Sequence, residues 1–84
     1  MLSRIDTHVA TLHDVPMVEH VANKVQSARV TAGITQEGLA ARVGVSRQTI
    51  IAVEKGNYTP SVMLALKLAR VFNLSVEKLF TIES

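Results

Sequence analysis

The side chains best suited to contact another molecule lie in one short stretch in the middle of the chain, Gly44–Gly56. Arg47 offers a cationic fork of hydrogen-bond donors, and Gln48 offers an amide that both donates and accepts. In a helix over this stretch, Ile51 and Ala52 share the outward face with these two polar groups. Such a face is suited to contact with a surface that is partly polar and partly apolar.

Groups that would support catalysis or metal binding are sparse in the sequence. His8, His13 and His20 are spaced by five and seven residues, so they do not share one helical face with Asp6 or Asp14. The sequence contains no H-E-x-x-H motif and no glycine-rich phosphate loop. With no cysteine, disulfides and thiol catalysis are excluded. We therefore predict a protein that is not an enzyme and that has neither a metal site nor a cofactor.

The distribution of charge is more informative than its total. The 84 residues suffice for one domain, and a hydrophobic content of 48% is ample for a core. The net charge of +2 conceals an asymmetry, since residues 24–70 contain seven bases and two acids, whereas residues 1–23 contain one base and three acids. A basic body of this kind indicates a polyanionic partner.

Hydropathy argues against a membrane protein. No uncharged apolar run approaches the roughly 18 residues that a membrane span requires. Arg4 and Asp6 are followed by a polar mixture, which is not typical of a signal peptide. The absence of cysteine fits a reducing compartment. We therefore expect a soluble, cytoplasmic protein.

Glycine, proline and hydroxyl residues divide the chain from Pro16 onward into five predicted helices. Apolar residues recur at helical spacing after Pro16, and Gly33 ends this first helix. Four further helices, each beginning at a hydroxyl residue that can cap it, are predicted near 35–43, 46–55, 61–72 and 75–80. Residues 1–15 form either a flexible arm or a short strand.

The predicted fold is thus an all-α, five-helix domain over residues 16–84. Its core is expected to contain Val25, Ala28, Leu39, Ala40, Val43, Val45, Ile50, Val53, Leu66, Ala69 and Phe72.

Two of the predicted helices are joined by Gly44 and Val45 alone. A connection this short forces the helices to cross steeply, which is the helix-turn-helix unit, here over residues 36–55. The crossing requires a small residue, Ala40, and a left-handed backbone at Gly44. Five further positions must be apolar to lock the crossing angle, and all five are: Leu39, Val43, Val45, Ile50 and Val53.

The segments VQSARVTAGITQEGLAARVGVSRQTIIAVEKG and NYTPSVMLALKLARVFNLSVEKLF resemble the Cro and phage-repressor (XRE) type of helix-turn-helix regulators. The resemblance covers roughly residues 21–82 and is strongest to the small single-domain members. It implies a five-helix, lambda-repressor-like domain that binds duplex DNA. Arg29 and Glu54 match family positions that form a structural ion pair.

The resemblance also implies that the helix over 46–55 enters the major groove with its N-terminal residues at base edges. Base contacts are then expected from Arg47 to guanine or phosphate, from Gln48 to adenine, from an exposed Ile51 to a thymine methyl, and from Ala52, whose small size permits close approach. Phosphate contacts are expected from residues at helix ends and in the following loop: Gln36, Ser46, Lys55, Asn57 and Ser61.

The C-terminal half contains more apolar residues than a small core can easily enclose. One recognition helix covers few base pairs, so we expect a two-fold homodimer that places two such helices about 34 Å apart on a palindromic operator. The residues expected at the dimer interface are Met63, Leu64, Leu74, Val76, Leu79, Phe80 and Ile82. In the alternative, the last helix closes the core of the monomer instead.

The sequence therefore predicts a DNA-binding transcriptional regulator, in particular a repressor. A second interpretation is an antitoxin or partner-binding regulator, in which the N-terminal arm or the C-terminal surface binds another protein. The acidic arm is the feature that favours this second interpretation, because the small members of the family do not need it.

Overall fold

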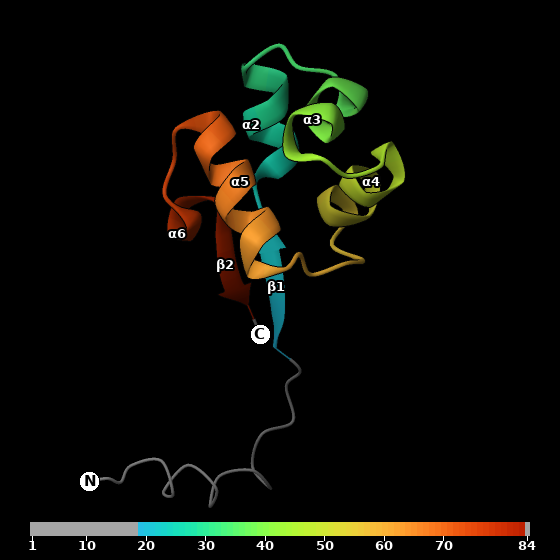
Figure 1. Cartoon of the computed structure of the whole chain (residues 1–84). Coiled ribbons are helices and arrows are strands. Elements are labelled where there is room, and N and C mark those ends of the chain that lie inside the picture. The colour runs from blue at the N-terminus through green and yellow to red at the C-terminus, as the bar shows by residue number, and fades with distance from the viewer. Residues whose placement is uncertain (1–18, 84) are drawn as a thin grey trace, which may run out of the picture.

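The computed structural model describes residues 19–83 (Figure 1). These residues form five helices and one two-stranded sheet, which confirms the predicted helical class and adds a small sheet to it. The predicted arm at 1–15 and the predicted helix start at Pro16 lie outside the described residues. In chain order the elements are β1 (His20–Asn23), α2 (Val25–Thr31), α3 (Gln36–Val43), α4 (Arg47–Lys55), α5 (Val62–Phe72), α6 (Val76–Leu79) and β2 (Phe80–Glu83).

Hydroxyl side chains begin four of the helices, as the sequence predicts. The side-chain oxygens of Thr35, Ser46, Ser61 and Ser75 accept hydrogen bonds from the backbone N–H groups of Gly38, Thr49, Leu64 and Lys78, at 2.9, 3.2, 3.1 and 3.3 Å. Each bond satisfies a donor that the first helical turn would otherwise leave free. Local sequence is therefore sufficient to explain where α3, α4, α5 and α6 begin.

The first predicted helix is wrong over residues 20–23, because β1 occupies them and α2 begins only after it. Helix α2 begins at Val25 rather than at Pro16. Strand β1 pairs antiparallel with β2, with Val21 opposite Ile82. The Oδ1 atom of Asn23 accepts a hydrogen bond from the Val25 N–H group at 3.0 Å, where the chain turns from strand into helix. Val21 and Ala22 thus belong to a strand, not to the first turns of a helix.

The two strands form a ribbon, the name we use for β1 and β2 together, that joins the two ends of the described chain. Helix α6 ends at Leu79, one residue before the predicted end, because Phe80 is already extended (φ −128°) and begins β2. The N–H group of Lys24 donates to the carbonyl of Leu79 at 2.9 Å. The ribbon projects from one end of the helical body, near the loop between α4 and α5 (Figure 1).

The core lies among the five helices. Its most deeply buried large side chains are Leu39, Ile50, Leu68 and Leu79. The predicted core residues Ala28, Val45 and Phe72 are partly buried and pack against this cluster. Most of the predicted core is therefore confirmed.

Helix α5 is the exception, because it buries a different face from the predicted one. Leu66, predicted to be in the core, is 52% exposed. The sequence of α5 is apolar except for Lys67 and Arg70, which are exposed. The helix turns these two charges toward solvent, so the opposite side becomes the buried one. The residues that α5 buries are Leu64, Ala65, Leu68 and Ala69.

Candidate nucleic-acid interface

The crossing of α3 and α4 holds α4 in position. Gly44 adopts the left-handed conformation (φ 76°), and the N–H group of Val45 donates to the carbonyl of Ala40 at 3.0 Å. Ala40 itself is buried. The apolar residues predicted to lock the angle lie in or against the core: Leu39, Val43, Val45, Ile50 and Val53. The helix-turn-helix unit thus has the predicted construction.

Helix α4 exposes Arg47 and Gln48 in its first turn. Ile51, expected to be exposed in the free protein, is half-buried, and so is Ala52. Arg47 and Lys55 lie four positions before and after Ile51, so the three residues share one face of α4. The outward face of α4 is therefore a polar border around a small apolar centre.

A chain of hydrogen bonds links Arg47 to the interior. The Nη2 atom of Arg47 donates to Gln36 Oε1 at 3.4 Å, and Gln36 Nε2 donates to Glu54 Oε1 at 3.1 Å. Arg29 binds the same carboxylate, with Nε 2.6 Å from Oε2 and Nη2 3.2 Å from Oε1. Because the Gln36 amide turns its NH₂ group toward Glu54, its carbonyl oxygen faces Arg47. The interior thus orients one of the two exposed polar side chains of α4.

The ion pair expected between Arg29 and Glu54 is confirmed, and it is sheltered from solvent. The two side chains are 12% and 3% exposed, and Arg29 Nη1 also donates to the carbonyl of Ile34 at 2.9 Å. The hydrogen bond to Glu54 raises the pKa of Arg29 above its ordinary value; burial opposes this rise, and the attraction of the carboxylate adds to it. The guanidinium therefore stays charged, and the pair fastens α2 to α4.

The residues expected at DNA phosphates lie at helix ends and in the loop after α4. Gln36 is the first residue of α3, where backbone N–H groups are free of intrahelical partners. Lys55 and Asn57 are exposed at the C-terminal end of α4. Ser46 and Ser61 cap α4 and α5. The backbone N–H groups at such helix N-termini are the groups that can bind an anion.

Two residues near this face escaped the sequence prediction. Tyr58 is exposed in the loop after α4 and, with Gln48, Thr49, Ala52 and Asn57, lines a shallow hollow of about 350 Å³. Its signal was an aromatic residue two positions after Gly56, the glycine that ends α4. Asn23 donates from Nδ2 to the carbonyl of Val53 at 2.8 Å and so ties the ribbon to α4. Asn23 had no local signal, because its role depends on the strand pairing.

The residues expected at a dimer interface separate into two groups. Leu64 and Leu79 are 6% and 0% exposed and belong to the core, so the expectation that they lie at the surface is wrong. Leu64 is buried because α5 turns a different face inward from the predicted one, and Leu79 is buried where α6 packs against the core. The burial of Leu79 fits the alternative in which the last helix closes the core of the monomer. The others are exposed or half-buried: Met63, Leu74, Val76, Phe80 and Ile82.

The remaining titratable groups of the described chain do not build another site. His20 Nε2 lies 3.9 Å from Glu83 Oε1, and both side chains are largely exposed, so the pair contributes little to stability. Within residues 19–83, no three His, Asp or Glu side chains are grouped so that they could hold a metal ion. None of the helices described between these residues has the length and apolarity needed to cross a bilayer.

The sequence is similar to a known family and to several known proteins. The family model described as Helix-turn-helix matches residues 25–79. An uncharacterised HTH-type transcriptional regulator of Methanocaldococcus jannaschii is 51% identical over 61 residues, which are 73% of this chain and 92% of that protein. The cryptic phage CTXphi transcriptional repressor of Vibrio cholerae is 31% identical over 58 residues, which are 69% of this chain and 52% of the repressor.

The fold is also similar to those of solved structures. The restriction-modification controller protein C.AhdI of Aeromonas hydrophila superposes with a TM-score of 0.61 at 29% identity, over 66% of this chain and 83% of that one. The crystal structure of a putative DNA-binding protein of Bacteroides fragilis superposes with a TM-score of 0.67, over 73% of this chain and 98% of that one. At 23% identity, the second likeness concerns the fold alone.

Proposed function

Because the chain belongs to the helix-turn-helix family of DNA-binding transcriptional regulators, we propose that it represses transcription by binding, as a homodimer, to a palindromic operator. Membership of this family makes it a regulator and not an enzyme. The observation that carries the proposal is the construction of α4. Its first turn exposes Arg47 and Gln48, while its inner face is locked across α3 by buried residues.

In this proposal, α4 lies in the major groove and its N-terminal residues read base edges. Arg47 is suited to a guanine, whose O6 and N7 atoms accept the two parallel donors of a guanidinium. Gln48 is suited to an adenine, which offers an acceptor at N7 and a donor at N6. Ile51 meets a thymine methyl, and Ala52 lets the helix approach closely. The tether from Gln36 to Arg47 supports this assignment, because an oriented side chain loses less freedom on binding.

Phosphates flank the same face in the proposal. The N-terminus of α3 at Gln36, the caps Ser46 and Ser61, and the exposed Lys55 and Asn57 contact the two strands that border the groove. Such contacts set the position of the protein on DNA and supply affinity that falls with salt, but they do not read sequence.

We infer the homodimer from the small number of base pairs that one recognition helix can contact. A single module of this size covers too few base pairs to be selective in a genome, and a dyad doubles the site. Repression is supported by the phage repressor among the relatives. Binding to an operator requires the protein to share a compartment with the DNA, so we place it in the cytoplasm.

Selection of bound sequences from a random duplex library, at two stated salt concentrations, tests the proposal. We expect enrichment of a palindrome whose half-sites are about one helical turn apart, centre to centre. The Arg47→Ala/Gln48→Ala double variant serves as the control and should enrich no motif. Enrichment of a single half-site would refute the homodimer, and failure of the wild-type chain to enrich any motif would refute operator binding.

A further inference from the structure

We propose that Glu54 is a positioning residue for DNA reading, because it fixes the orientation of the Gln36 amide and, through it, the direction of the Arg47 guanidinium. The inference rests on the proposed function, since it takes α4 as the reading helix. It goes beyond the structural ion pair that the sequence predicts, because Glu54 then affects base preference without touching DNA. We call the four linked residues, Arg29, Glu54, Gln36 and Arg47, the polar relay.

The inner end of the polar relay holds the Glu54 carboxylate in place. Arg29 Nε lies 2.6 Å from Oε2 and Arg29 Nη2 lies 3.2 Å from Oε1, and the Glu54 side chain is only 3% exposed. Two parallel bonds from a planar guanidinium leave the carboxylate little freedom to turn. Its Oε1 atom is thus held where Gln36 Nε2 reaches it, at 3.1 Å.

The carboxylate determines which end of the Gln36 amide faces it, because an ionised carboxylate can only accept hydrogen bonds. The NH₂ group therefore points toward Glu54, and the carbonyl oxygen points toward Arg47. A guanidinium can only donate, so Arg47 matches this carbonyl and would be opposed by an NH₂ group. Donors and acceptors thus alternate along the polar relay, and the alternation begins at the buried ion pair.

The polar relay orients Arg47 without neutralising it. Within residues 19–83, the Gln36 carbonyl is the only protein group that accepts a hydrogen bond from the Arg47 side chain, and Arg47 forms no ion pair there. The bond uses Nη2, at 3.4 Å, so the other N–H donors remain free for a base. A carboxylate in the place of this carbonyl would instead offset the charge that attracts the side chain to DNA.

The outer end of the polar relay is the part that a DNA strand can meet. Arg47 is exposed and Gln36 is half-buried, whereas the side chain of Glu54 is almost fully enclosed. Gln36 and Arg47 line one hollow of about 480 Å³ together with Thr35. Glu54 does not line this hollow, so any effect that it has on base preference must pass through the two outer residues.

Glu54→Gln tests the polar relay, because it exchanges one acceptor for a donor at nearly the same volume. Arg29 Nε, the closer of the two donors, keeps an oxygen at the position of Oε2, so the new NH₂ group faces Gln36. The Gln36 amide must then turn over, which sets its NH₂ group against Arg47. We expect the preference at the base pair read by Arg47 to fall about twofold to tenfold, because the side chain is no longer oriented. Competition among single-base variants of the duplex that the wild-type chain selects measures this preference.

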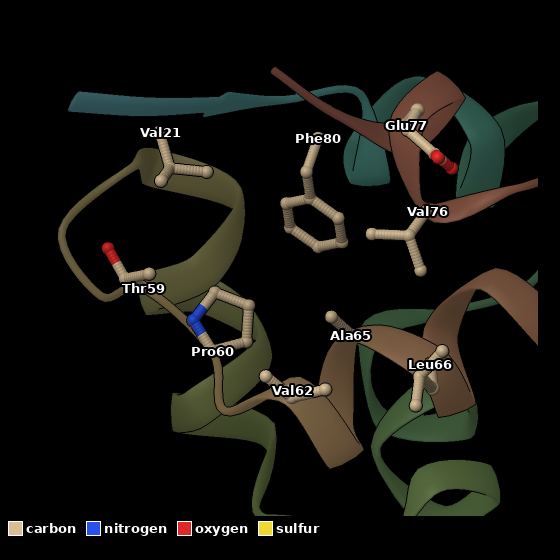
Figure 2. A pocket seen from close by; sticks show the side chains of 9 residues that line it. All are labelled: Val21, Thr59, Pro60, Val62, Ala65, Leu66, Val76, Glu77 and Phe80. Carbon is tan, nitrogen blue, oxygen red and sulfur yellow. The ribbon is translucent and has the colours of Figure 1, made fainter. Parts of the chain in front are cut away.

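The matched control is Glu77→Gln, the same exchange at a residue outside the polar relay. Glu77 is exposed and borders an apolar groove of about 570 Å³ that Val76 and Phe80 also line (Figure 2). None of the residues that line this groove belongs to the polar relay. Both variants remove one negative charge, so a change in affinity that comes from net charge is common to the two. Glu77→Gln should leave the base preference unchanged.

Gln36→Met interrupts the polar relay and leaves the pair of Arg29 and Glu54 intact, so it does not depend on the folding of Glu54→Gln. It should lower the same base preference by a similar factor, while the loss of a phosphate contact weakens all sequences evenly. In the Gln36→Met background, Glu54→Gln should have no further effect on preference, because its effect passes through Gln36. A further loss in that background would overturn the polar relay. Urea unfolding of each variant reports stability separately.

Proton exchange of the Gln36 side chain gives a readout that needs no DNA. In the free protein the NH₂ protons of Gln36 are bound to a buried carboxylate, which slows their exchange with water. In Glu54→Gln they turn toward the exposed Arg47, so their signals in ¹H–¹⁵N spectra should exchange faster than in wild type and in Glu77→Gln. Unchanged exchange in a folded Glu54→Gln would show that the amide has not turned and would overturn the polar relay.

The outcomes separate this inference from the proposed function. If Arg47→Ala relaxes the preference at a base pair and Glu54→Gln does not, the polar relay is overturned and DNA reading by α4 stands. If Glu54→Gln relaxes a preference that Arg47→Ala leaves unchanged, Glu54 acts through another residue, and the polar relay is again overturned. A wild-type chain without any base preference would refute operator binding and the polar relay together.

Discussion

Arg47 is joined through Gln36 to a carboxylate in the interior, and this tether makes it the side chain most suited to specify a base. We expect Arg47→Ala to cost about 1–3 kcal/mol of binding free energy at one base pair and to relax the preference there, with Gln48→Ala acting in the same way at another base pair. Lys55→Ala is the control, since loss of a phosphate contact weakens all sequences evenly and lowers the salt slope. Competition among single-base operator variants measures both effects. Unchanged preference in the Arg47→Ala/Gln48→Ala double variant would disprove the assignment.

Arg29 supplies the positive charge that pairs with the buried carboxylate of Glu54. Arg29→Met should lower the free energy of unfolding by about 3–5 kcal/mol, because Glu54, only 3% exposed, would be left in the interior without its partner. The pKa of Arg29 is higher in the folded protein than in the unfolded chain. The stability that Arg29 contributes is therefore fully present at pH values below its pKa in the unfolded chain. It is lost only as pH rises through its higher pKa in the folded protein. The effect should therefore be the same across neutral pH.

The Arg29→Met/Glu54→Leu double variant is the control in urea unfolding. Replacing both charges by apolar groups of similar volume removes the buried charge, so stability should recover in large part. A double variant as unstable as Arg29→Met would show that lost packing, and not an uncompensated charge, causes the effect.

At the scale of elements, the turn between α3 and α4 depends on one backbone conformation. A Cβ at Gly44 would meet nothing within 4 Å, so strain at φ 76° is the only cost of adding one. We expect Gly44→Ala to cost about 1–2 kcal/mol in thermal unfolding. Gly44→Asn should cost less, because asparagine tolerates this region, as Asn73 does at φ 56° in the same chain. Equal losses for the two variants would contradict the argument.

The ribbon is fastened to α4 through Asn23, whose amide donates to the Val53 carbonyl and accepts from the Val25 N–H group. Asn23→Asp keeps the acceptor but sets a carboxylate oxygen against a carbonyl. We expect a loss of about 1–3 kcal/mol in urea unfolding, the cost of an unsatisfied pair of polar groups. Asn23→Ala, which removes both bonds without adding a charge, separates lost bonding from repulsion. A stable Asn23→Asp would show that the link is not needed.

The sequence could predict the elements whose ends are marked by neighbouring capping residues and glycines. Ser46 and Gly44 act on the residues next to them, so the bounds of α3 and α4 follow from the sequence. Periodicity alone could not orient α5, because its residues are apolar on nearly every side. The positions of Lys67 and Arg70 would have oriented it, since the buried stripe is opposite to both.

For the whole molecule, composition correctly indicated surplus apolar residues in the C-terminal half but could not divide them between core and surface. Leu79 and Ile82 are both large and aliphatic, and only the packing of α6 and β2 separates a fully buried residue from an exposed one. The construction of the helix-turn-helix unit was predictable because its spacing is rigid, whereas the half-burial of Ile51 on the α4 face was not predicted. Strand β1 was not, because its partner lies at the opposite end of the described chain.

The distance along the chain between β1 and β2 has a consequence for folding. The helices contact near neighbours in sequence, whereas the ribbon must close a loop that contains all five helices described here, and loop-closure entropy delays it. We infer that the ribbon closes after the transition state for folding. Ala22→Gly, a change in β1, should then destabilise by roughly 0.5–1 kcal/mol, almost all of it through faster unfolding. Stopped-flow refolding at the same rate as wild type, within about twofold, would place the ribbon last, and slowed refolding would place it in the nucleus.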